Sequence, residues 1–429
     1  MKRAAPTGTA AFLIGGKTLH SLFRLTPKTN TKMDIEAYQP GVLNEVQNEF
    51  SGCNLLVIDE KSMVGVYMLY RIDQRLKEIT GKKTKSFGGM SIVLLGDFAQ
   101  LPPIGDKPMY TTDLRDDKAS CYQNKGSALF KEFKTTFVLS QAMRQMGPDQ
   151  EQFRNVLDRI SRGEMDIDDW NFLNKRNIEN IPENEKERFL EEGIKICALN
   201  KSYIEFNVRR VKALGTPLGL VKSENTNATI AALNSEQAEG LPAEILLAKG
   251  CYVRLTLSLW SECGLTNGAR GYVRYAIYNN NEKPPMLPCF VIVEFPSYIG
   301  PAFLKPEDVS CELRESVEKF VPIKPELKRW YRNKKLVFRE MLPLKLAYGT
   351  SIHSTQGLTM KGKVLIDLGP REFAAGLVYT AISRCKRLED ILFDPMSNCR
   401  RFCLKKNKVF KDRQNQLQGE KDSSSVRSA

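Results

Sequence analysis

Uninterrupted runs of apolar residues along the chain predict strands that are buried on both faces. Four such runs stand out, at 54–60 (NLLVIDE), 91–97 (SIVLLGD), 194–199 (IKICAL) and 363–369 (KVLIDLG). Strands with one wet face alternate apolar and polar residues, whereas strands of a parallel sheet covered by helices do not. The runs therefore favour parallel sheets.

Helical patterns separate these runs. The segments 67–80 (YMLYRIDQRLKEIT) and 150–163 (QEQFRNVLDRISRG) repeat apolar residues at helical spacing. Strands that alternate with helices are typical of α/β layers. We therefore expect an α/β fold.

From about residue 249 the pattern changes to short runs typical of an antiparallel β-domain. They are 251–260, 264–278, 289–295 and 334–349. The pair Asn267-Gly268 predicts a hairpin turn, because both residues of the favoured turn must accept a positive φ. A small inserted β-barrel is the simplest account of this region. The polar segment after about residue 412 is predicted to be disordered.

Composition narrows the class of protein. The 429 residues suffice for two or three domains, and 42% of them are hydrophobic, which excludes a disordered chain. The net charge of +14 favours a polyanionic partner such as nucleic acid, although a solvated basic surface would give the same sum. Ten cysteines without a CxxC pair and only two histidines argue against a zinc site and for a reducing, intracellular compartment. No apolar run is long enough to span a membrane.

The segment 15–18 (GGKT) raises the question of a phosphate-binding loop. That loop needs a glycine, four residues and then Gly-Lys-Ser/Thr, so that backbone N–H groups wrap the phosphates and the lysine reaches them. Gly16, Lys17 and Thr18 would end such a motif, but Ala11 stands where its first glycine should be. We interpret GGKT as a turn before the next helix.

Two of the apolar runs end in candidate catalytic residues. Asp59 and Glu60 follow the first run, where one carboxylate could hold Mg²⁺ and the other polarise water, although two exposed acids after a strand are also common. After the run at 91–97, Gln100 precedes Pro102 and Pro103, which would hold its amide rigidly near a phosphate.

Two arginines and one turn complete the candidates. Arg144 and Arg384 each follow a short apolar segment and could neutralise charge that develops in phosphoryl transfer, or lie on the surface as most arginines do. The turn at 353–357 could contact a nucleic-acid backbone with one face and a nucleotide with the other. It contains His353, Ser354, Thr355, Gln356 and Gly357.

Taken in order, seven segments resemble the motif series of the petite-integration-frequency (Pif-one) DNA helicases, a superfamily-one group that includes Helitron-type helicases. The segments are APTGTAAFLIGGKTLHSLF, VIDEKSM, FGGMSIVLLGDFAQLPPIGD, LSQAMRQ, LTNGARGYV, SIHSTQGLT and VYTAISR. The resemblance extends from residue 4 to about residue 393. The sequences QLPP and NGARG and the His-x-x-Gln-Gly turn make the resemblance specific.

The resemblance implies a fold and a domain division. We expect two RecA-like parallel-sheet domains with a small SH3-like β-barrel inserted in the second. The expected bounds are 1–138 for the first domain, 139–245 with 341–411 for the second, 246–340 for the barrel and 412–429 for the disordered tail. ATP would bind between the RecA-like domains, and single-stranded DNA would cross both.

The resemblance also implies roles for individual residues. Asp59 would hold Mg²⁺ and Glu60 would activate water, while Gln100 would sense the γ-phosphate and Arg144 and Arg384 would reach ATP. Gln356 and Gly357 would contact the nucleotide. DNA contacts would come from Thr7, Gly8, His20, His353, Ser354 and Thr355. Lys61 departs from the family pattern, because it places a cation beside the acidic pair.

The activity implied is that of an ATP-dependent DNA helicase, an ATP hydrolase that moves 5′ to 3′ on single-stranded DNA in repair, recombination or telomere maintenance. We expect a monomer in the nucleus or the mitochondrion. Family members carry the phosphate-binding lysine loop upstream of the first segment, so we expect this chain to be a truncated form. The alternatives are an ATPase-deficient single-stranded DNA-binding remnant of a helicase or transposon protein, and a plain α/β scaffold.

Overall fold

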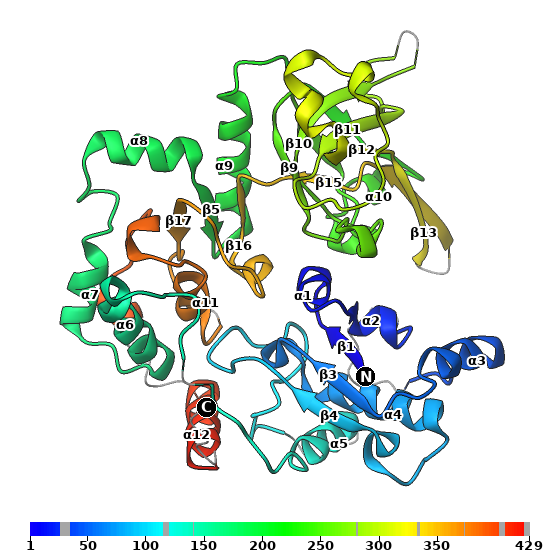
Figure 1. The fold of residues 1–429 in the computed structure, drawn as a ribbon, viewed down its shortest axis with the longest axis vertical. Helices are drawn as coiled ribbons and strands as arrows, with labels where there is room; N and C mark the ends of the chain where they lie inside the picture. Colours follow the sequence, from blue (N-terminus) through cyan, green and yellow to red (C-terminus); the bar gives the residue numbers. More distant parts are fainter. Residues whose placement is uncertain are drawn as a thin grey trace. The chain divides into compact units, whose positions relative to one another are not determined.

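The computed structural model describes residues 1–25, 35–114, 120–139, 141–279, 282–332, 335–372, 374–402 and 408–423 (Figure 1). The chain forms two compact units. Unit 1 contains Met1–Leu190 and Thr355–Ala429, and unit 2 contains Glu191–Ser354. No helix in the described ranges is both long and apolar enough to cross a membrane.

A four-stranded parallel sheet begins unit 1. Its strand order is β2-β1-β3-β4, with the bounds β1 Lys2–Ala5, β2 Lys17–Thr18, β3 Leu55–Ile58 and β4 Ser91–Leu94. Val57 of β3 lies opposite Arg3 of β1 on one side and Val93 of β4 on the other. The apolar runs at 54–60 and 91–97 are thereby confirmed as parallel strands.

Helices on this sheet bury the apolar side chains of β3. Strand β4 differs from the prediction, because it is not buried on both faces and its Val93 is 40% exposed. The helices are α1 Gly8–Leu13, α2 Leu19–Leu22, α3 Pro40–Glu49, α4 Val66–Thr80 and α5 Cys121–Phe130. Leu69, Ile72 and Leu76 recur at helical spacing on α4 and share one core with Leu56 and Ile58 of β3. The helix predicted over 67–80 is therefore confirmed.

The rest of unit 1 comes from two distant parts of the chain. Its helices are α6 Glu151–Arg162, α7 Ile167–Asn174, α11 Leu377–Ser383 and α12 Lys408–Ser423, and α8 Glu183–Glu192 ends just past its boundary. Strands β17 (Val364–Asp367) and β18 (Ile391–Phe393) pair in parallel and are buried along their whole length. These elements confirm the strand predicted at 363–369 and the helix predicted at 150–163.

Helix α12 differs from the predicted disordered tail. Asp412 and Arg413 are buried on it, and Leu417 packs against the core of the first sheet. Polar composition predicted disorder wrongly here. Buried polar side chains of the helix form hydrogen bonds with the rest of unit 1, and these stabilise it together with the apolar contact of Leu417. Residues 424–429 lie outside the described part of the chain.

Unit 2 carries mainly antiparallel strands. A five-stranded sheet has the order β12-β11-β10-β9-β15, with β9 Tyr252–Leu255, β10 Arg270–Ile277, β11 Phe290–Glu294, β12 Phe320–Ile323 and β15 Leu344–Leu346. Further antiparallel pairs join β6 Gly219–Lys222 to β8 Glu244–Leu247, and β14 Lys335–Met341 to both β13 Glu326–Arg332 and β7 Glu224–Asn225.

A parallel pair accompanies the antiparallel sheets of unit 2. Strand β5 (Ile194–Cys197), predicted at 194–199, lies beside β16 (Gly349–Ser351). The helices of this unit are α9 Asn200–Lys212 and α10 Ala228–Ala231. The predicted domain bounds stay a prediction, and β15 extends the antiparallel sheet beyond the expected limit at residue 340.

The connection around Asn267-Gly268 is longer than the predicted hairpin turn. Strands β9 and β10 do form an antiparallel pair, with Arg254 opposite Arg270. Of the two turn residues only Gly268 has a positive φ, of 98°. The strands are joined by the whole segment 256–269, in which the amide of Asn267 donates to the Ser258 hydroxyl at 3.0 Å. A tight turn does form at Asn267-Gly268, where the Ala269 amide donates to Thr266 O at 2.9 Å, but the connection between the two strands is longer than these two residues.

Candidate functional site

The backbone turns sharply where β3 ends at Asp59 and Glu60. Glu60 has φ 54° and ψ 50°, the left-handed conformation, and its amide donates to Asp59 Oδ1 at 2.8 Å. The turn is anchored to the neighbouring strand, because the Lys61 amide donates to Leu95 O at 2.7 Å. Such a backbone at a residue other than glycine costs on the order of 1–3 kcal/mol and typically marks a functional position.

The Glu60 carboxyl group lies in a buried, charged environment. Burial raises its pKa, the charges of Arg384 and Arg144 oppose the rise, and those of Asp59 and Asp97 add to it. Glu60 Oε2 is buried and has no hydrogen-bond partner in the described part of the chain. A buried carboxyl group with a raised pKa and a free oxygen is suited to accept a proton.

Arg384 brings a buried positive charge to this carboxyl group from the end of α11. Its side chain is 1% exposed, and its Nη1 and Nη2 donate at 3.4 and 3.3 Å to Leu358 O and Ser383 Oγ. Its Nε has no partner among the described residues. Burial, helped by the charge of Arg144, lowers the pKa of Arg384 to about 10, so the guanidinium remains charged at neutral pH.

Arg144 approaches the same place from a loop and is partly exposed. Its Nε donates to Thr359 Oγ1 at 3.0 Å, and its Nη1 donates to Ser383 O at 2.8 Å. Arg144 therefore contacts the last carbonyl group of α11, and Arg384 is the next residue in the chain. Two guanidinium groups held together repel one another, which favours an anion between or beside them.

The end of β4 carries Asp97 and Gln100. Asp97 Oδ1 accepts from the Ala99 amide at 2.8 Å, and the Gln100 amide donates to Asp97 O at 3.2 Å. Tyr379 of α11 is hydrogen-bonded to the Asp97 carboxylate, and burial raises the pKa of its hydroxyl. Gln100 Oε1 is buried without a partner in the described ranges. Helix α11 thus connects the Gln100 loop to the arginines.

Gln356 and Gly357 lie against the same two loops. Gln356 is 3% exposed, and its Nε2 donates to Leu101 O at 3.2 Å. Gly357 has φ 76°, and a Cβ atom there would lie 3.4 Å from Glu60 Oε1. Gly357 is therefore in close contact with the carboxyl group, and its positive φ favours glycine at this position. The structure brings together all seven of the predicted nucleotide residues, namely Asp59, Glu60, Gln100, Arg144, Gln356, Gly357 and Arg384.

This cluster leaves polar atoms without partners. Within the described part of the chain, Glu60 Oε2, Gln100 Oε1, Gln356 Oε1 and Arg384 Nε are buried and unpaired. Buried polar groups are paired in the great majority of cases, so several unpaired ones near each other indicate a site for a polar ligand. No group of three or more His, Cys, Asp or Glu side chains suited to a metal occurs in the described ranges. A single carboxylate such as Asp59 still suits Mg²⁺, which retains waters and takes phosphate ligands.

The predicted DNA-contacting residues are divided between the two units. Thr7 caps α1, where its Oγ1 accepts from the Ala10 amide at 3.3 Å, and Gly8 begins that helix. His20 lies on α2, and burial and the charge of Arg71 lower its pKa. These three belong to unit 1. Their roles stay predictions.

The remaining predicted DNA contacts belong to the turn Ile352–Thr355. Burial lowers the pKa of His353, and Ser354 Oγ lies 2.9 Å from Ser351 Oγ, both in unit 2. Thr355 begins the second segment of unit 1 and is fully buried. The hydroxyl of Thr355 is therefore poorly placed to meet DNA directly, and its predicted role remains untested.

The GGKT segment begins at a glycine turn and continues as strand β2 (Lys17–Thr18), so it is a turn only in its first part. Lys17 Nζ lies 2.8 Å from Glu49 Oε1, and Thr18 caps α2 by accepting from the Ser21 amide at 3.1 Å. Gly15 has φ 58°, and a Cβ atom on Gly16 would lie 2.4 Å from Arg3 O. Lys61, which departs from the family pattern, makes a cation–π contact, because its ammonium lies 4.4 Å from the centroid of the Phe98 ring.

Three residues near the cluster escaped the sequence analysis. Asp97 ends a predicted strand and Tyr379 lies in the VYTAISR segment, so both could have been found from the motif series. Arg413 contacts Ala99 from α12, and the polar composition of that segment gave no sign of it.

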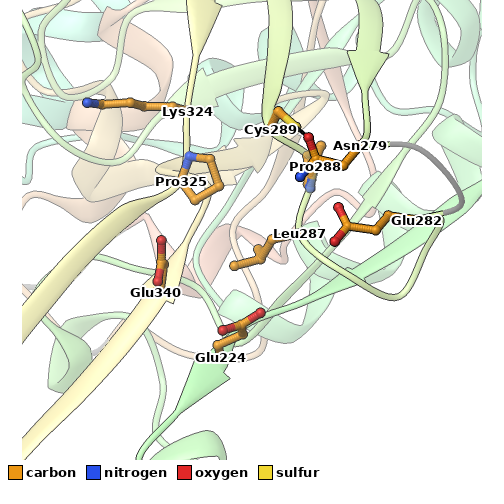
Figure 2. Close-up of a pocket in the computed structure, with 9 residues that line it drawn as sticks. All are labelled: Glu224, Asn279, Glu282, Leu287, Pro288, Cys289, Lys324, Pro325 and Glu340. Atoms are coloured by element: carbon orange, nitrogen blue, oxygen red, sulfur yellow. Dashed lines mark hydrogen bonds between the residues drawn. The ribbon is translucent and has the colours of Figure 1, made fainter.

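A separate pocket lies in unit 2 and shares no residue with the cluster (Figure 2). Its lining is mostly polar and consists of Glu224, Asn279, Glu282, Leu287, Pro288, Cys289, Lys324, Pro325 and Glu340. Cys289 Sγ donates to Asn279 Oδ1 at 3.0 Å at its upper edge (Figure 2). None of the predicted site residues lines this pocket.

Parallel strands that end in acidic and amide side chains, with Arg384 at the end of α11 and Arg144 from a loop, place the chain in the RecA-like α/β class. Residues 2–170 match the family model of the PIF1-like helicases. The predicted resemblance is thereby confirmed: the chain is related to the PIF1-like helicases.

Individual relatives agree with this assignment. The chain is 29% identical over 400 residues to the ATP-dependent DNA helicase PIF1 of Xenopus laevis, covering 91% of this chain and 54% of that protein. The crystal structure of Pif1 helicase from Candida albicans has a TM-score of 0.68 at 22% identity, covering 97% of this chain and 89% of that one. Pif1 helicase from Bacteroides in complex with ADP-AlF3 and ssDNA has a TM-score of 0.67 at 22% identity, covering 98% and 87%. These structures confirm the predicted fold class.

Proposed function

We propose that this chain forms the motor part of an ATP-dependent DNA helicase that moves along single-stranded DNA. The observation that carries the proposal is the cluster around Glu60, where unpaired buried polar atoms coincide with the residues that the family resemblance assigns to ATP. Relatives named as ATP-dependent DNA helicases support it. The chain spans about half the length of these curated relatives.

Each residue of the cluster has a chemical task in this proposal. Glu60 accepts the proton of the attacking water, and its raised pKa moves it towards the range in which a base works at neutral pH. Gln100 contacts the γ-phosphate through its amide. Arg384 and Arg144 neutralise the charge that develops in phosphoryl transfer. Asp59 would hold Mg²⁺, which when bound neutralises phosphate charge.

DNA binding follows from charge and from the predicted contact residues. The net charge of +14 favours a phosphate backbone. Thr7, Gly8, His20, His353 and Ser354 supply small polar contacts in this proposal, and Thr355 supports the turn from within. The 5′ to 3′ direction, a role in repair, recombination or telomere maintenance, and a nuclear or mitochondrial location come from the family resemblance.

The oligomeric state belongs to the same proposal. We expect a monomer, although one similar structure concerns DNA unwinding at forked dsDNA by two coordinating Pif1 helicases. The domain division proposed is two RecA-like domains, 1–138 and 139–245 with 341–411, and an SH3-like insertion at 246–340.

Phosphate release with and without oligo-dT tests the proposal. In a form of the protein that includes the phosphate-binding lysine loop of the family, we expect DNA-stimulated turnover that falls strongly in Glu60→Gln and is kept in Lys17→Ala, since Lys17 is paired with Glu49. Single-stranded DNA binding without turnover would identify the alternative, a DNA-binding remnant of a helicase or transposon protein. Strand separation on duplexes with a 5′ or a 3′ tail then tests the direction.

A further inference from the structure

Helix α12 reaches the cluster through one buried arginine. Arg413 is 1% exposed, and its Nη1 donates to Ala99 O at 2.9 Å while its Nη2 donates to Ser161 O at 3.2 Å. Ala99 immediately precedes Gln100, the predicted γ-phosphate sensor. The guanidinium therefore holds the main chain one residue before the sensor.

The start of α11 meets the same point. Gly376 caps that helix with φ 91°, and a Cβ atom on it would lie 2.4 Å from Ala99 O and 2.9 Å from both Gln100 O and Arg413 Nη1. Further along, the Leu101 amide donates to Thr380 Oγ1 at 3.0 Å. The sensor loop, α12 and α11 are thus in direct contact, and α11 ends at Arg384.

The neighbours of Arg413 on α12 strengthen the attachment. Asp412 Oδ2 accepts from the amide and the hydroxyl of Thr112 at 3.0 and 2.8 Å. Gln414 Nε2 donates to Ser161 O at 3.0 Å. Asp412 and Arg413 therefore hold the loop 99–112 at both of its ends.

A buried guanidinium is expensive unless its hydrogen bonds are made, so Arg413 is a poor choice for simply filling space. Its bonds go to main-chain carbonyl groups, which fixes backbone positions and not side-chain packing. An apolar residue in its place would leave Ala99 O without this donor, and the sensor loop would be free to shift.

We propose that Arg413 is a positioning residue, which fixes the sensor loop against the start of α11 so that Gln100 and Arg384 act on the same phosphate group. This inference rests on the proposed ATPase function. It assigns α12 a part in catalysis that neither its sequence nor its polar surface indicates. Misplacing a sensor by about 1 Å can cost on the order of 10²-fold in rate.

The experiment compares Arg413→Met, Arg413→Lys and the control Lys411→Met, which alters an exposed position on the same helix. We expect Arg413→Met to lower kcat for DNA-stimulated ATP hydrolysis by roughly 10- to 100-fold, with the Kd for single-stranded DNA unchanged. Arg413→Lys keeps the charge and one donor, so it should recover part of the loss. Lys411→Met should match the wild type.

Hydrogen exchange at residues 99–112 provides a readout that needs no turnover. We expect faster exchange there in Arg413→Met, less in Arg413→Lys and none in Lys411→Met. Unchanged exchange, or a kcat equal to that of the control, would overturn the inference. If the wild type releases no phosphate, the proposed function fails and exchange alone decides whether α12 holds the loop. If Arg413→Met does not fold, Arg413→Lys and Thr112→Val, which removes one bond to Asp412, decide in its place.

Discussion

Two segments of unit 1 resemble phosphate sites in sequence, the GGKT turn and the cluster around Glu60, and the structure treats them in opposite ways. In the turn, Lys17 is paired with Glu49 and Thr18 caps a helix. In the cluster, Glu60 Oε2 and Arg384 Nε are buried and lack partners among the described residues. The comparison indicates that buried polar atoms without hydrogen-bond partners are a better sign of a candidate ligand site than a partial match to a short sequence motif.

The difference has an energetic side. A buried polar atom without a partner costs about 1–3 kcal/mol, so the cluster lowers stability until a ligand meets its groups. The turn carries no such cost. Changes in the cluster should therefore trade activity against stability, whereas changes in the turn should affect stability alone.

The largest expected effect belongs to Arg384→Ala. We expect ATP turnover to fall by about 10³ to 10⁵, the range of an arginine that neutralises transition-state charge. Arg387→Ala, in the exposed stretch just after it, is the matched control and should change turnover little. Steady-state phosphate release measures both. Similar turnover in the two variants would remove Arg384 from the site and weaken the contrast with the turn.

Glu60→Gln should separate activity from stability. Turnover should fall by about 10² to 10⁴, the usual contribution of a general base, while ATP binding persists. Because the folded pKa of Glu60 is raised, the folded state holds its proton more tightly, and ionisation costs stability as the pH rises above the unfolded value. The variant should therefore melt at a higher temperature at pH 8. A lower melting temperature there would contradict the account of its burial.

Glu372 extends the comparison to the other end of α11. Its Oε1 accepts from the Leu377 amide at 3.2 Å, and burial raises its pKa to about 7 against the charges of Arg401 and Arg413. Between the unfolded value of 4.5 and about 7 the folded state binds more protons, so stability falls as the pH rises through this window. Glu372→Gln should remove this loss, on the order of 3 kcal/mol at pH 8. Denaturant unfolding at pH 4 and pH 8 checks it, and an equal effect at both would refute it.

The smallest effect is expected for Lys17→Ala. The pair with Glu49 is partly exposed, with 46% of the Lys17 side chain accessible, so its loss should cost less than about 1 kcal/mol. Turnover should not change. A large loss of turnover with normal stability would make GGKT a phosphate loop after all.

Much of the fold follows from local pattern. Unbroken apolar runs identified β3, β4, β5 and β17. Burial on both faces, the reason given for these runs, holds throughout β17 but not for β4, where Val93 is 40% exposed. Helix α4 follows from its apolar spacing. The ends of β3 and β4 then brought Asp59, Glu60 and Gln100 to one edge of the sheet. The pattern was enough because these features depend on neighbours in the sequence.

What the sequence did not show depends on contacts between distant residues. Tyr379 meets Asp97, and Arg413 meets Ala99, only because α11 and α12 return to the first sheet. The turn at Asn267-Gly268 lies within a longer connection than expected, and of its two central residues only Gly268 has a positive φ. Composition misjudged α12 for a related reason, since a polar helix can be held by its partners.

The contacts of Asp412 and Arg413 with the loop 99–112 can form only late in synthesis of the chain. Thr112 and Asp412 are separated by 300 residues, and a ribosome that adds about 5–20 residues each second needs roughly 15–60 s to cross that interval. Through this interval the first sheet can already pair its strands, but the loop beside Gln100 lacks Arg413 and Asp412. A nascent chain therefore carries Asp59 and Glu60 early, whereas the loop 99–112 is secured only after α12 has emerged.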